Sequence, residues 1–374
     1  MPLEEIRVAI IGAGVVGLSI AAELGQEGVF VFEKNRSFGL ETSSRNSEVV
    51  HAGIYYLGGS LKAQLCIEGR NLLYEFCEKH GVRYRRCGKV IIAVSEDEIA
   101  KLEILYERAK GNGVQDVSLI SRREIKKLEP NVKGIAGLYS PSTGILDTYS
   151  FMEALYNKAK GSGVEFVFDC EVVGIEKANL KYIVYIREGK KTSSFTATAL
   201  INSAGLNAKR VAQLAGIDTI QAGYETYLLK GDYFSISAKK WGLVKRLIYP
   251  VPGVIGVGIH NCIAIDGRER LGPSEYYVDD MDYRVNEDDR GRFYNFSKRF
   301  FPFLEPDDLE PESSGIRPVL QGPGGTAFKD FIVVHEGKRG FPGLINLIGI
   351  ESPGFTSSIA IGRYVRELTK EILG

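Results

Sequence analysis

The chain has 374 residues, of which 44% are hydrophobic and 25% charged, a composition typical of a globular protein long enough for two domains. Lysine plus arginine equals aspartate plus glutamate, 47 of each, which disfavours a nucleic-acid-binding surface. The five cysteines show no C-x-x-C spacing and no long apolar run is present, which argues against a metal site, a disulfide framework and a membrane span. These features predict a cytoplasmic protein.

The N-terminal stretch has the pattern of a nucleotide-binding unit. Residues 8–11 are apolar and predict a buried parallel strand, and an Ala/Leu-rich run to Gly25 predicts a helix. Between them stand Gly12, Gly14 and Gly17. This spacing permits a tight turn, a close approach of a pyrophosphate to the backbone, and packing of the helix on the strand. The amino end of such a helix attracts phosphate groups.

A second short strand, residues 29–32, ends on Glu33, about 20 residues beyond the glycines. A carboxylate at this place accepts hydrogen bonds from a ribose diol. The complete unit therefore predicts a dinucleotide-binding site. A signal peptide or membrane span is disfavoured, because the segment is short, contains Glu23 and is interrupted by glycines.

The next part of the chain is expected to alternate between helices and strands. A polar segment at 42–56 is rich in Thr, Ser, Asn and Arg, which can satisfy cofactor oxygens; the alternative is a surface loop. Apolar residues at helical spacing predict helices over 61–79 and 96–110, and an apolar run predicts a strand over 89–94. A further helix is expected to end near Lys160.

Strands are then predicted over 164–175 and 182–186, and the charged turn 188–191 fits a hairpin. The stretch 198–207 predicts another buried strand that leads through a loop into a helix. Small residues follow this strand, so a backbone there can approach a ligand closely.

From about residue 223 to 301 tyrosines and prolines become frequent, which predicts an antiparallel sheet in a second domain. Buried strands return at 332–334 and 344–348, and a glycine-rich turn at 349–356 opens a C-terminal helix. We therefore expect a discontinuous nucleotide-binding domain (1–85, 150–220 and 315–374) and a substrate-binding domain (86–149 and 221–314).

Several further motifs make the chain similar to a known family. They are Arg45-Asn-Ser-Glu-Val-Val-His-Ala-Gly-Ile-Tyr-Tyr56, Ser60-Leu-Lys-Ala63, Cys87-Gly-Lys-Val90, Leu247-Ile-Tyr-Pro-Val-Pro252, Gly315-Ile-Arg-Pro318 and Leu347-Ile-Gly-Ile-Glu-Ser-Pro-Gly354. With them, nearly the whole chain resembles the FAD-dependent oxidoreductases of the D-amino-acid oxidase type. Within that type it is most similar to the L-2-hydroxyglutarate oxidase/dehydrogenase group.

The resemblance implies an α/β fold, with a Rossmann-like FAD-binding domain and an α+β, mainly antiparallel substrate-binding domain. The turn before the C-terminal helix would face the flavin pyrimidine ring, where a helix N-terminus stabilises the negative charge of reduced flavin. The implied FAD-binding residues are Gly12, Ala13, Gly14, Val15, Val16, Gly17, Glu33, Lys34, Thr42, Ser43, Ser44, Arg45, Asn46, Ser47, Val172, Ala204, Gly205, Gly349, Gly354, Phe355 and Thr356.

Two departures from the group concern the substrate more than the cofactor. The usual Gly-Val-His-Leu-Thr stands here as Gly258-Ile-His-Asn-Cys262, which keeps the histidine and changes its neighbours. Many relatives have a glycine after the asparagine-serine pair, where this chain has Glu48.

The implied reaction needs a group that accepts the substrate hydroxyl proton, and histidine suits this role because it titrates near neutral pH. The chain has four histidines. His260 and His51 are the two candidates; the alternatives are a buried core residue for His260 and a flavin-positioning or FAD-attaching group for His51. His80 and His335 are expected to be surface residues.

Arg317 matches the arginine that in many relatives pairs with the substrate carboxylate through two parallel hydrogen bonds; the alternative is a surface salt bridge. Tyr55 and Tyr249 are candidates for the substrate pocket, although simple packing is as good an explanation. Lys230 is a candidate for a second substrate carboxylate.

The expected function is therefore FAD-dependent oxidation of a small L-2-hydroxy acid, most simply L-2-hydroxyglutarate to 2-oxoglutarate. The rivals are an amine or amino-acid oxidase (glycine, sarcosine or D-amino acid), a glycerol-3-phosphate-type dehydrogenase, and a dinucleotide-binding sensor without turnover. Oxygen, a quinone and an electron-transfer protein all stay open as electron acceptors. Contact with the inner membrane would suit a quinone, but no strongly basic amphipathic helix supports it.

Overall fold

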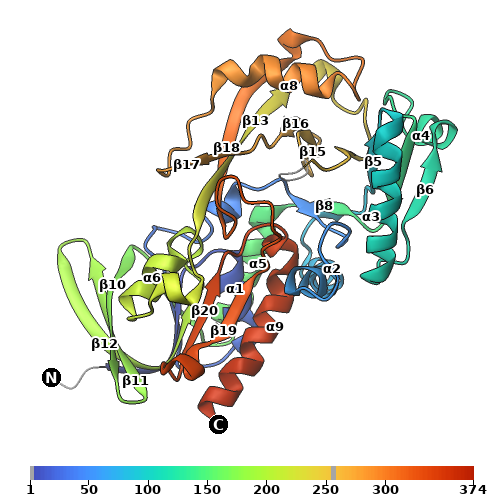
Figure 1. The fold of residues 1–374 in the computed structure, drawn as a ribbon. Coiled ribbons are helices and arrows are strands. Elements are labelled where there is room, and N and C mark those ends of the chain that lie inside the picture. The colour runs from blue at the N-terminus through green and yellow to red at the C-terminus, as the bar shows by residue number, and fades with distance from the viewer. Residues whose placement is uncertain (1–3, 254–257) are drawn as a thin grey trace.

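The computed structural model describes residues 4–253 and 258–374. Its largest sheet has eight strands (Figure 1). Strand β1 (Glu4–Ile11) lies at the centre and pairs in parallel with β2 (Val29–Phe32) and β12 (Lys191–Asn202). Parallel strands β9 (Glu165–Val167) and β20 (Leu344–Ile348) extend the sheet beyond these neighbours. The sheet is therefore the parallel nucleotide-binding sheet that the sequence predicts.

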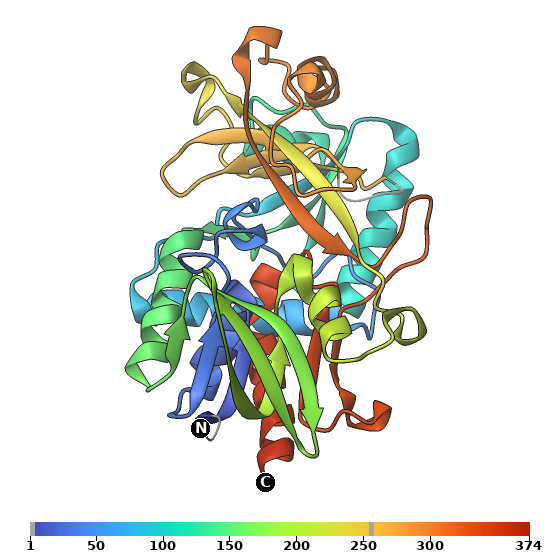
Figure 2. The same ribbon diagram turned by 90° about the vertical axis from the view of Figure 1, so that its left-hand side faces the viewer.

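An antiparallel meander adjoins the parallel strands. Strands β10 (Cys170–Ala178) and β11 (Lys181–Glu188) form a ribbon with the first part of β12 (Figure 2). The predicted hairpin at 188–191 is confirmed, since Glu188 pairs with Lys191. The predicted strand over 164–175 is instead divided into β9 and β10. Asp169 stands at the break with φ +53°, a left-handed conformation that regular strands do not contain. Strand β19 (Ile332–His335) pairs with β20 at the other edge.

Four helices pack on one face of the parallel sheet and bury a shared core. They are α1 (Val15–Leu24), α2 (Leu61–His80), α5 (Thr148–Gly161) and α9 (Gly354–Leu373). The predicted helix over 61–79 is thus confirmed within one residue. No helix in the described part of the chain combines the length and the hydropathy needed to cross a bilayer.

A second, antiparallel sheet lies above the nucleotide-binding sheet in Figure 1. Its five strands are β13 (Tyr227–Ile236), β15 (His260–Ile263), β16 (Glu269–Gly272), β17 (Tyr276–Val278) and β18 (Leu309–Val319). Strand β13 pairs with β18 along its whole length. These two long strands reach down toward the nucleotide-binding sheet (Figure 2).

A third, four-stranded sheet completes the upper half of the molecule. Its order is β14 (Leu247–Pro250), β5 (Lys89–Ala93), β7 (Ala136–Ser140) and β6 (Ser118–Ser121), and β14 and β5 are parallel. The residues expected to form the second domain therefore contribute two sheets, one of them mixed, and one strand, β8, of a separate three-stranded sheet. The remaining elements are β3 (Val49–Val50), β4 (Tyr84–Arg85), β8 (Gly144–Leu146), α3 (Ile99–Gly111), α4 (Arg122–Leu128), α6 (Ala208–Leu214), α7 (Thr219–Ala222) and α8 (Arg290–Ser297).

The α/β fold class expected from the sequence is confirmed. The domain boundaries expected from the sequence stay a prediction, because β13 and β18 pass close to both halves of the structure.

Candidate functional site

An elongated cavity runs from the carboxyl ends of β1 and β2 to the underside of the antiparallel sheet. Most of the FAD-binding residues predicted from the sequence line it. These are Gly12, Gly14, Val15, Val16, Glu33, Lys34, Thr42, Ser43, Arg45, Asn46, Ser47, Val172, Ala204, Gly205, Gly354 and Phe355. Five predicted positions do not line it: Ala13, Gly17, Ser44, Gly349 and Thr356.

The turn between β1 and α1 has no room for side chains. Gly12 has φ +100°, and a Cβ on it would lie 2.8 Å from the carbonyl oxygen of Ser203. A Cβ on Gly17 would lie 1.9 Å from the carbonyl oxygen of Gly12, so Gly17 serves helix packing without lining the cavity. The amide of Val15 donates to Ser43 Oγ at 3.0 Å, while the next amides of α1 have no carbonyl partner within the helix. This turn fits a pyrophosphate.

Glu33 lies at the end of β2 with 8% exposure, and backbone and side-chain groups hold its carboxylate in place. Its Oε2 accepts from the Ala13 amide at 2.8 Å, and its Oε1 accepts from the amide and the side chain of Asn35 at 2.9 and 2.8 Å. Ala13 therefore orients the acid without lining the cavity. This geometry suits the ribose end of a dinucleotide.

The polar loop at 42–47 joins the two halves of the structure. The Thr42 hydroxyl donates to the carbonyl of Ile316 at 2.8 Å, and Ser47 Oγ lies 2.9 Å from the Tyr233 hydroxyl. Arg45 donates to the Ser314 carbonyl at 3.3 Å. The interpretation of this segment as a simple surface loop is thus not supported, because its side chains bind β13 and β18 across the cavity.

The amino end of α9 faces the same cavity through Gly354 and Phe355. Thr356 lies just behind: its hydroxyl accepts a hydrogen bond from the His51 amide at 3.0 Å. Gly349 adopts φ +69° and packs against Leu320, where a Cβ would lie 2.6 Å from the leucine side chain. These two residues shape the turn instead of lining the cavity.

His260, on β15, lines the far end of the cavity and is 3% exposed. Its Nδ1 lies 3.0 Å from the carbonyl oxygen of Asn261. A carbonyl only accepts, so Nδ1 carries the hydrogen and Nε2 is an acceptor, without a hydrogen-bond partner among the described residues. Burial lowers the pKa of His260 to about 3, so this imidazole does not titrate near neutral pH as the sequence suggested.

His51 lines the cavity beside His260. Its Nε2 is 3.4 Å from Ser352 Oγ, and its buried Nδ1 has no partner in the described part of the chain. Burial, followed by the positive charge of Lys89, lowers the pKa of His51 well below its ordinary value. The other two histidines lie elsewhere: His80 stacks on Phe76 at 4.2 Å, and His335 Nε2 accepts from the Gly343 amide.

Arg317, on β18, also lines the cavity, and two glutamates pair with it that sequence reasoning missed. Its guanidinium contacts the carboxylate of Glu275, which lines the cavity too, and lies 3.5 Å from Glu351 Oε2. Glu351 accepts in turn from Lys62 Nζ at 2.7 Å. Lys62 and Glu351 belong to the Ser-Leu-Lys-Ala and Glu-Ser-Pro-Gly motifs, which were the available signal.

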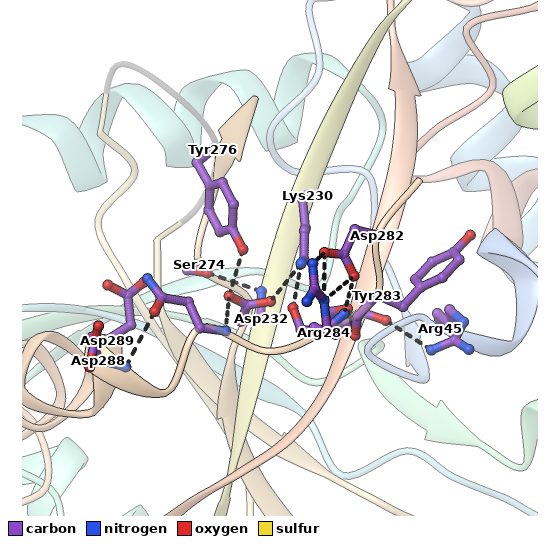
Figure 3. A network of polar contacts seen from close by, with 12 residues as sticks. Arg45, Lys230, Asp232, Ser274, Tyr276, Asp282, Tyr283, Arg284, Asp288 and Asp289 are labelled. Atoms are coloured by element: carbon purple, nitrogen blue, oxygen red, sulfur yellow. Dashed lines mark hydrogen bonds and ion pairs between the residues drawn. The ribbon is translucent and has the colours of Figure 1, made fainter. Parts of the chain in front are cut away.

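The two tyrosines and the lysine predicted for substrate binding have different positions. Tyr249 lines the cavity, and its ring stacks on the imidazole of His260 with centroids 3.7 Å apart. Tyr55 lies outside the lining. Lys230 also lies outside it and contacts the Arg284 carbonyl, with Asp232 Oδ1 4.0 Å away (Figure 3). Lys230 is thus engaged in a network on the far side of β13.

Sequence reasoning also missed Lys89. This residue of β5 is 1% exposed, and its ammonium lies 4.5 Å from the ring centroid of Tyr55 and 4.6 Å from that of Tyr249. Burial lowers the pKa of Lys89 to about 7. A lysine within an otherwise apolar strand was the only signal, and it is a weak one.

A family model described as FAD dependent oxidoreductase matches residues 7–368. The mitochondrial L-2-hydroxyglutarate dehydrogenase of Arabidopsis thaliana is 35% identical, with 97% of this chain and 83% of the relative covered. The L-2-hydroxyglutarate dehydrogenase of Escherichia coli K12 is 28% identical, with coverage of 97% and 93%.

Among solved structures, dithionite-reduced L-alpha-glycerophosphate oxidase from Mycoplasma pneumoniae with FAD bound superposes with a TM-score of 0.88 at 27% identity, covering 98% of this chain and 95% of that one. Glycine oxidase from Geobacillus kaustophilus gives a TM-score of 0.78 at 22% identity, with coverage of 98% and 95%, and shares the fold.

Proposed function

This chain belongs to the family of FAD-dependent oxidoreductases, and we propose that it oxidises L-2-hydroxyglutarate to 2-oxoglutarate. The observation that carries the proposal is the meeting of a free imidazole acceptor, His260 Nε2, and a guanidinium, Arg317, at one end of the FAD cavity. The L-2-hydroxyglutarate dehydrogenases of Arabidopsis thaliana and Escherichia coli K12, which are similar over nearly the whole chain, support the choice of substrate.

Different residues of the cavity have different roles in this reaction. FAD, when bound, would supply the acceptor for the hydride that leaves C2 of the substrate. Arg317 orients the carboxylate next to C2, and its charge is held in place by Glu275 and Glu351. His260 takes the hydroxyl proton at Nε2 as the C2–O bond becomes a carbonyl. The Asn261 carbonyl stabilises the resulting imidazolium through Nδ1.

Oxidation of a glycerol-phosphate-type substrate is the second candidate, favoured by the structural similarity to L-alpha-glycerophosphate oxidase. A phosphate group requires a cluster of cations. Arg317 is already paired with two carboxylates, which makes this end of the cavity less suited to a phosphate than to a carboxylate. A dinucleotide-binding sensor without turnover would not need a proton acceptor such as His260 and a guanidinium such as Arg317 together at one end of the cavity.

The direct test is a visible spectrum of the purified holoprotein before and after anaerobic addition of L-2-hydroxyglutarate. Bleaching of the flavin bands is expected. Persistent bands with this compound, together with bleaching by glycerol 3-phosphate, glycine or sarcosine, would overturn the proposed substrate and keep the family assignment. Reoxidation of the bleached flavin by air, a quinone or an electron-transfer protein then identifies the acceptor.

The base assignment is tested with His260→Asn. We expect the rate of flavin reduction to fall by about two to four orders of magnitude, with FAD still bound. Because burial keeps His260 neutral, the rate of flavin reduction at saturating L-2-hydroxyglutarate should stay flat from about pH 8 to about pH 5 in the wild-type protein. His51→Asn is the comparison variant: if it alone removes the reaction, the proton acceptor is His51.

A further inference from the structure

Lys89 is a buried cation without a counter-ion. Among the described residues no carboxylate lies within ion-pair distance of it, and residues 1–3 and 254–257 carry no acidic side chain. An ammonium taken out of water normally requires an anion or several hydrogen-bond acceptors. Among the described residues, the faces of the Tyr55 and Tyr249 rings contact this ammonium and stabilise its charge.

This ammonium lies directly behind the wall of the substrate end of the cavity. Strand β14 pairs with β5, the strand of Lys89, along one edge, and Asn261 of β15 accepts from the Ile248 amide at its other edge. The side chains therefore form a row across three strands: Lys89, then Tyr249, then His260. The ring of Tyr249 contacts both the ammonium and the imidazole of His260, and both Tyr249 and His260 line the cavity.

Three other cations around this end of the cavity each have a carboxylate partner. Arg317 pairs with Glu275, Lys62 with Glu351, and Arg270 with Glu312. Lys89 has no such partner among the described residues; Arg45, which also lines the cavity, donates to the Ser314 carbonyl and lies over the Tyr283 ring. A buried, unpaired positive charge beside the cavity favours an anion that carries one more negative charge than Arg317 alone would hold.

Building on the proposed oxidation of a 2-hydroxy acid, we propose that Lys89 is the specificity-determining residue that selects a dicarboxylate substrate. It acts from behind Tyr249 on the second carboxylate, while Arg317 receives the first. The sequence suggested Lys230 for the second substrate carboxylate, but Lys230 is held by Asp232 and the Arg284 carbonyl (Figure 3). We therefore assign this role to Lys89.

The preference for a dicarboxylate should depend on pH. The groups that face Lys89 keep one charge state near neutrality: burial raises the pKa of Cys66 to about 12 and raises the pKa values of Tyr55 and Tyr249, and it lowers those of His51 and His260. Arg317 stays charged. The pKa of Lys89 itself is lowered to about 7, so Lys89 loses its charge as the pH rises through this value.

The experiment compares L-2-hydroxyglutarate with its 5-amide, which has nearly the same shape and lacks the second charge. The readout is the ratio of the two kcat/KM values, measured with a dye as electron acceptor. We expect Lys89→Met to lower this ratio about tenfold and Lys89→Arg to preserve it. Lys101→Met, which removes an exposed lysine of α3, is the control and should leave the ratio unchanged.

In the wild-type protein the ratio should fall from about pH 6 to about pH 9, and in Lys89→Arg it should stay constant, because the guanidinium does not titrate in this range. A ratio that is unchanged in Lys89→Met and flat with pH in the wild type would overturn the inference while leaving the proposed reaction intact. If Lys89→Met does not retain FAD, the wild-type pH series decides. Failure of the wild type to oxidise either compound would instead overturn the proposed function.

Discussion

At Glu48 the sequence departs from the family pattern at a position with an unusual backbone conformation. Its φ is +60°, the left-handed region in which glycine has no steric penalty, and glycine is the residue that the resemblance led us to expect there. The backbone amide of Glu48 donates a hydrogen bond to Asn46 Oδ1 at 2.6 Å. Burial raises the pKa of its carboxyl group, so ionised Glu48 destabilises the fold.

We predict that Glu48→Gly is more stable than Glu48→Ala by about 1 kcal/mol, since both remove the carboxylate but only glycine relieves the left-handed backbone. Both variants should gain stability over the wild type at neutral pH, and the gain should shrink as the pH falls and Glu48 becomes protonated. Urea unfolding at neutral and acidic pH measures both effects. Equal stability of the two variants would contradict the conformational argument.

At the scale of the element, helix α2 begins with caps from two sources. Ser60 Oγ accepts from the Ala63 amide at 3.2 Å, which is a local N-cap. The carboxylate of Asp330, far away in the sequence, accepts from the Leu61 and Lys62 amides at 2.6 and 2.9 Å. The second cap fixes the turn that carries Lys62, and Lys62 in turn pairs with Glu351 beside Arg317.

We predict that Asp330→Ala costs about 2 kcal/mol of stability, because two amides at the start of α2 lose a charged acceptor. Asp330→Asn keeps one acceptor oxygen and should lose about half as much. Urea unfolding gives these free energies. Lys62 would be less well held in Asp330→Ala, so the KM for the substrate should rise as well; an unchanged KM would show that α2 does not influence the site.

At the scale of the whole molecule, the two halves meet around the cofactor cavity. Residues from β1, the 42–47 loop, β13, β15, β18 and α9 all contribute to its lining. The two halves approach each other closely at Gly315, where a Cβ would lie 2.3 Å from the carbonyl oxygen of Arg45. FAD bound in this cavity contacts both halves and should therefore stabilise them together. A ligand at about 100 times its Kd adds about 2.7 kcal/mol.

We predict that Gly315→Ala weakens FAD binding and reduces the rise in Tm on adding FAD to the apoprotein, because the methyl group pushes β18 away from the 42–47 loop. Gly291→Ala is the matched control: a Cβ there meets no atom within 4 Å, and alanine favours the α8 helix. Thermal unfolding at increasing FAD concentrations gives the rise in Tm for each variant and so distinguishes Gly315→Ala from Gly291→Ala. Equal shifts in both variants would show that this contact does not control cofactor binding.

The sequence by itself determined the parts of this protein that depend on neighbouring residues. Gly12, Gly14, Gly17 and Glu33 follow one another within a single strand-turn-helix-strand unit, so their spacing alone predicts where a dinucleotide lies. The hairpin at 188–191 and the helix α2 are local in the same sense, and the structure contains both.

The tertiary structure alone decided how the reacting end of the cavity is built. Lys89 is far in sequence from Tyr249 and His260, and the three meet only because β14 lies beside both β5 and β15. The same is true of Glu275 and Glu351 at Arg317. Burial then lowers the pKa of His260 to about 3 and that of Lys89 to about 7, because removal from water disfavours the charged form. Sequence spacing carries no information about burial of this kind, so the charge of these groups became visible only in the fold.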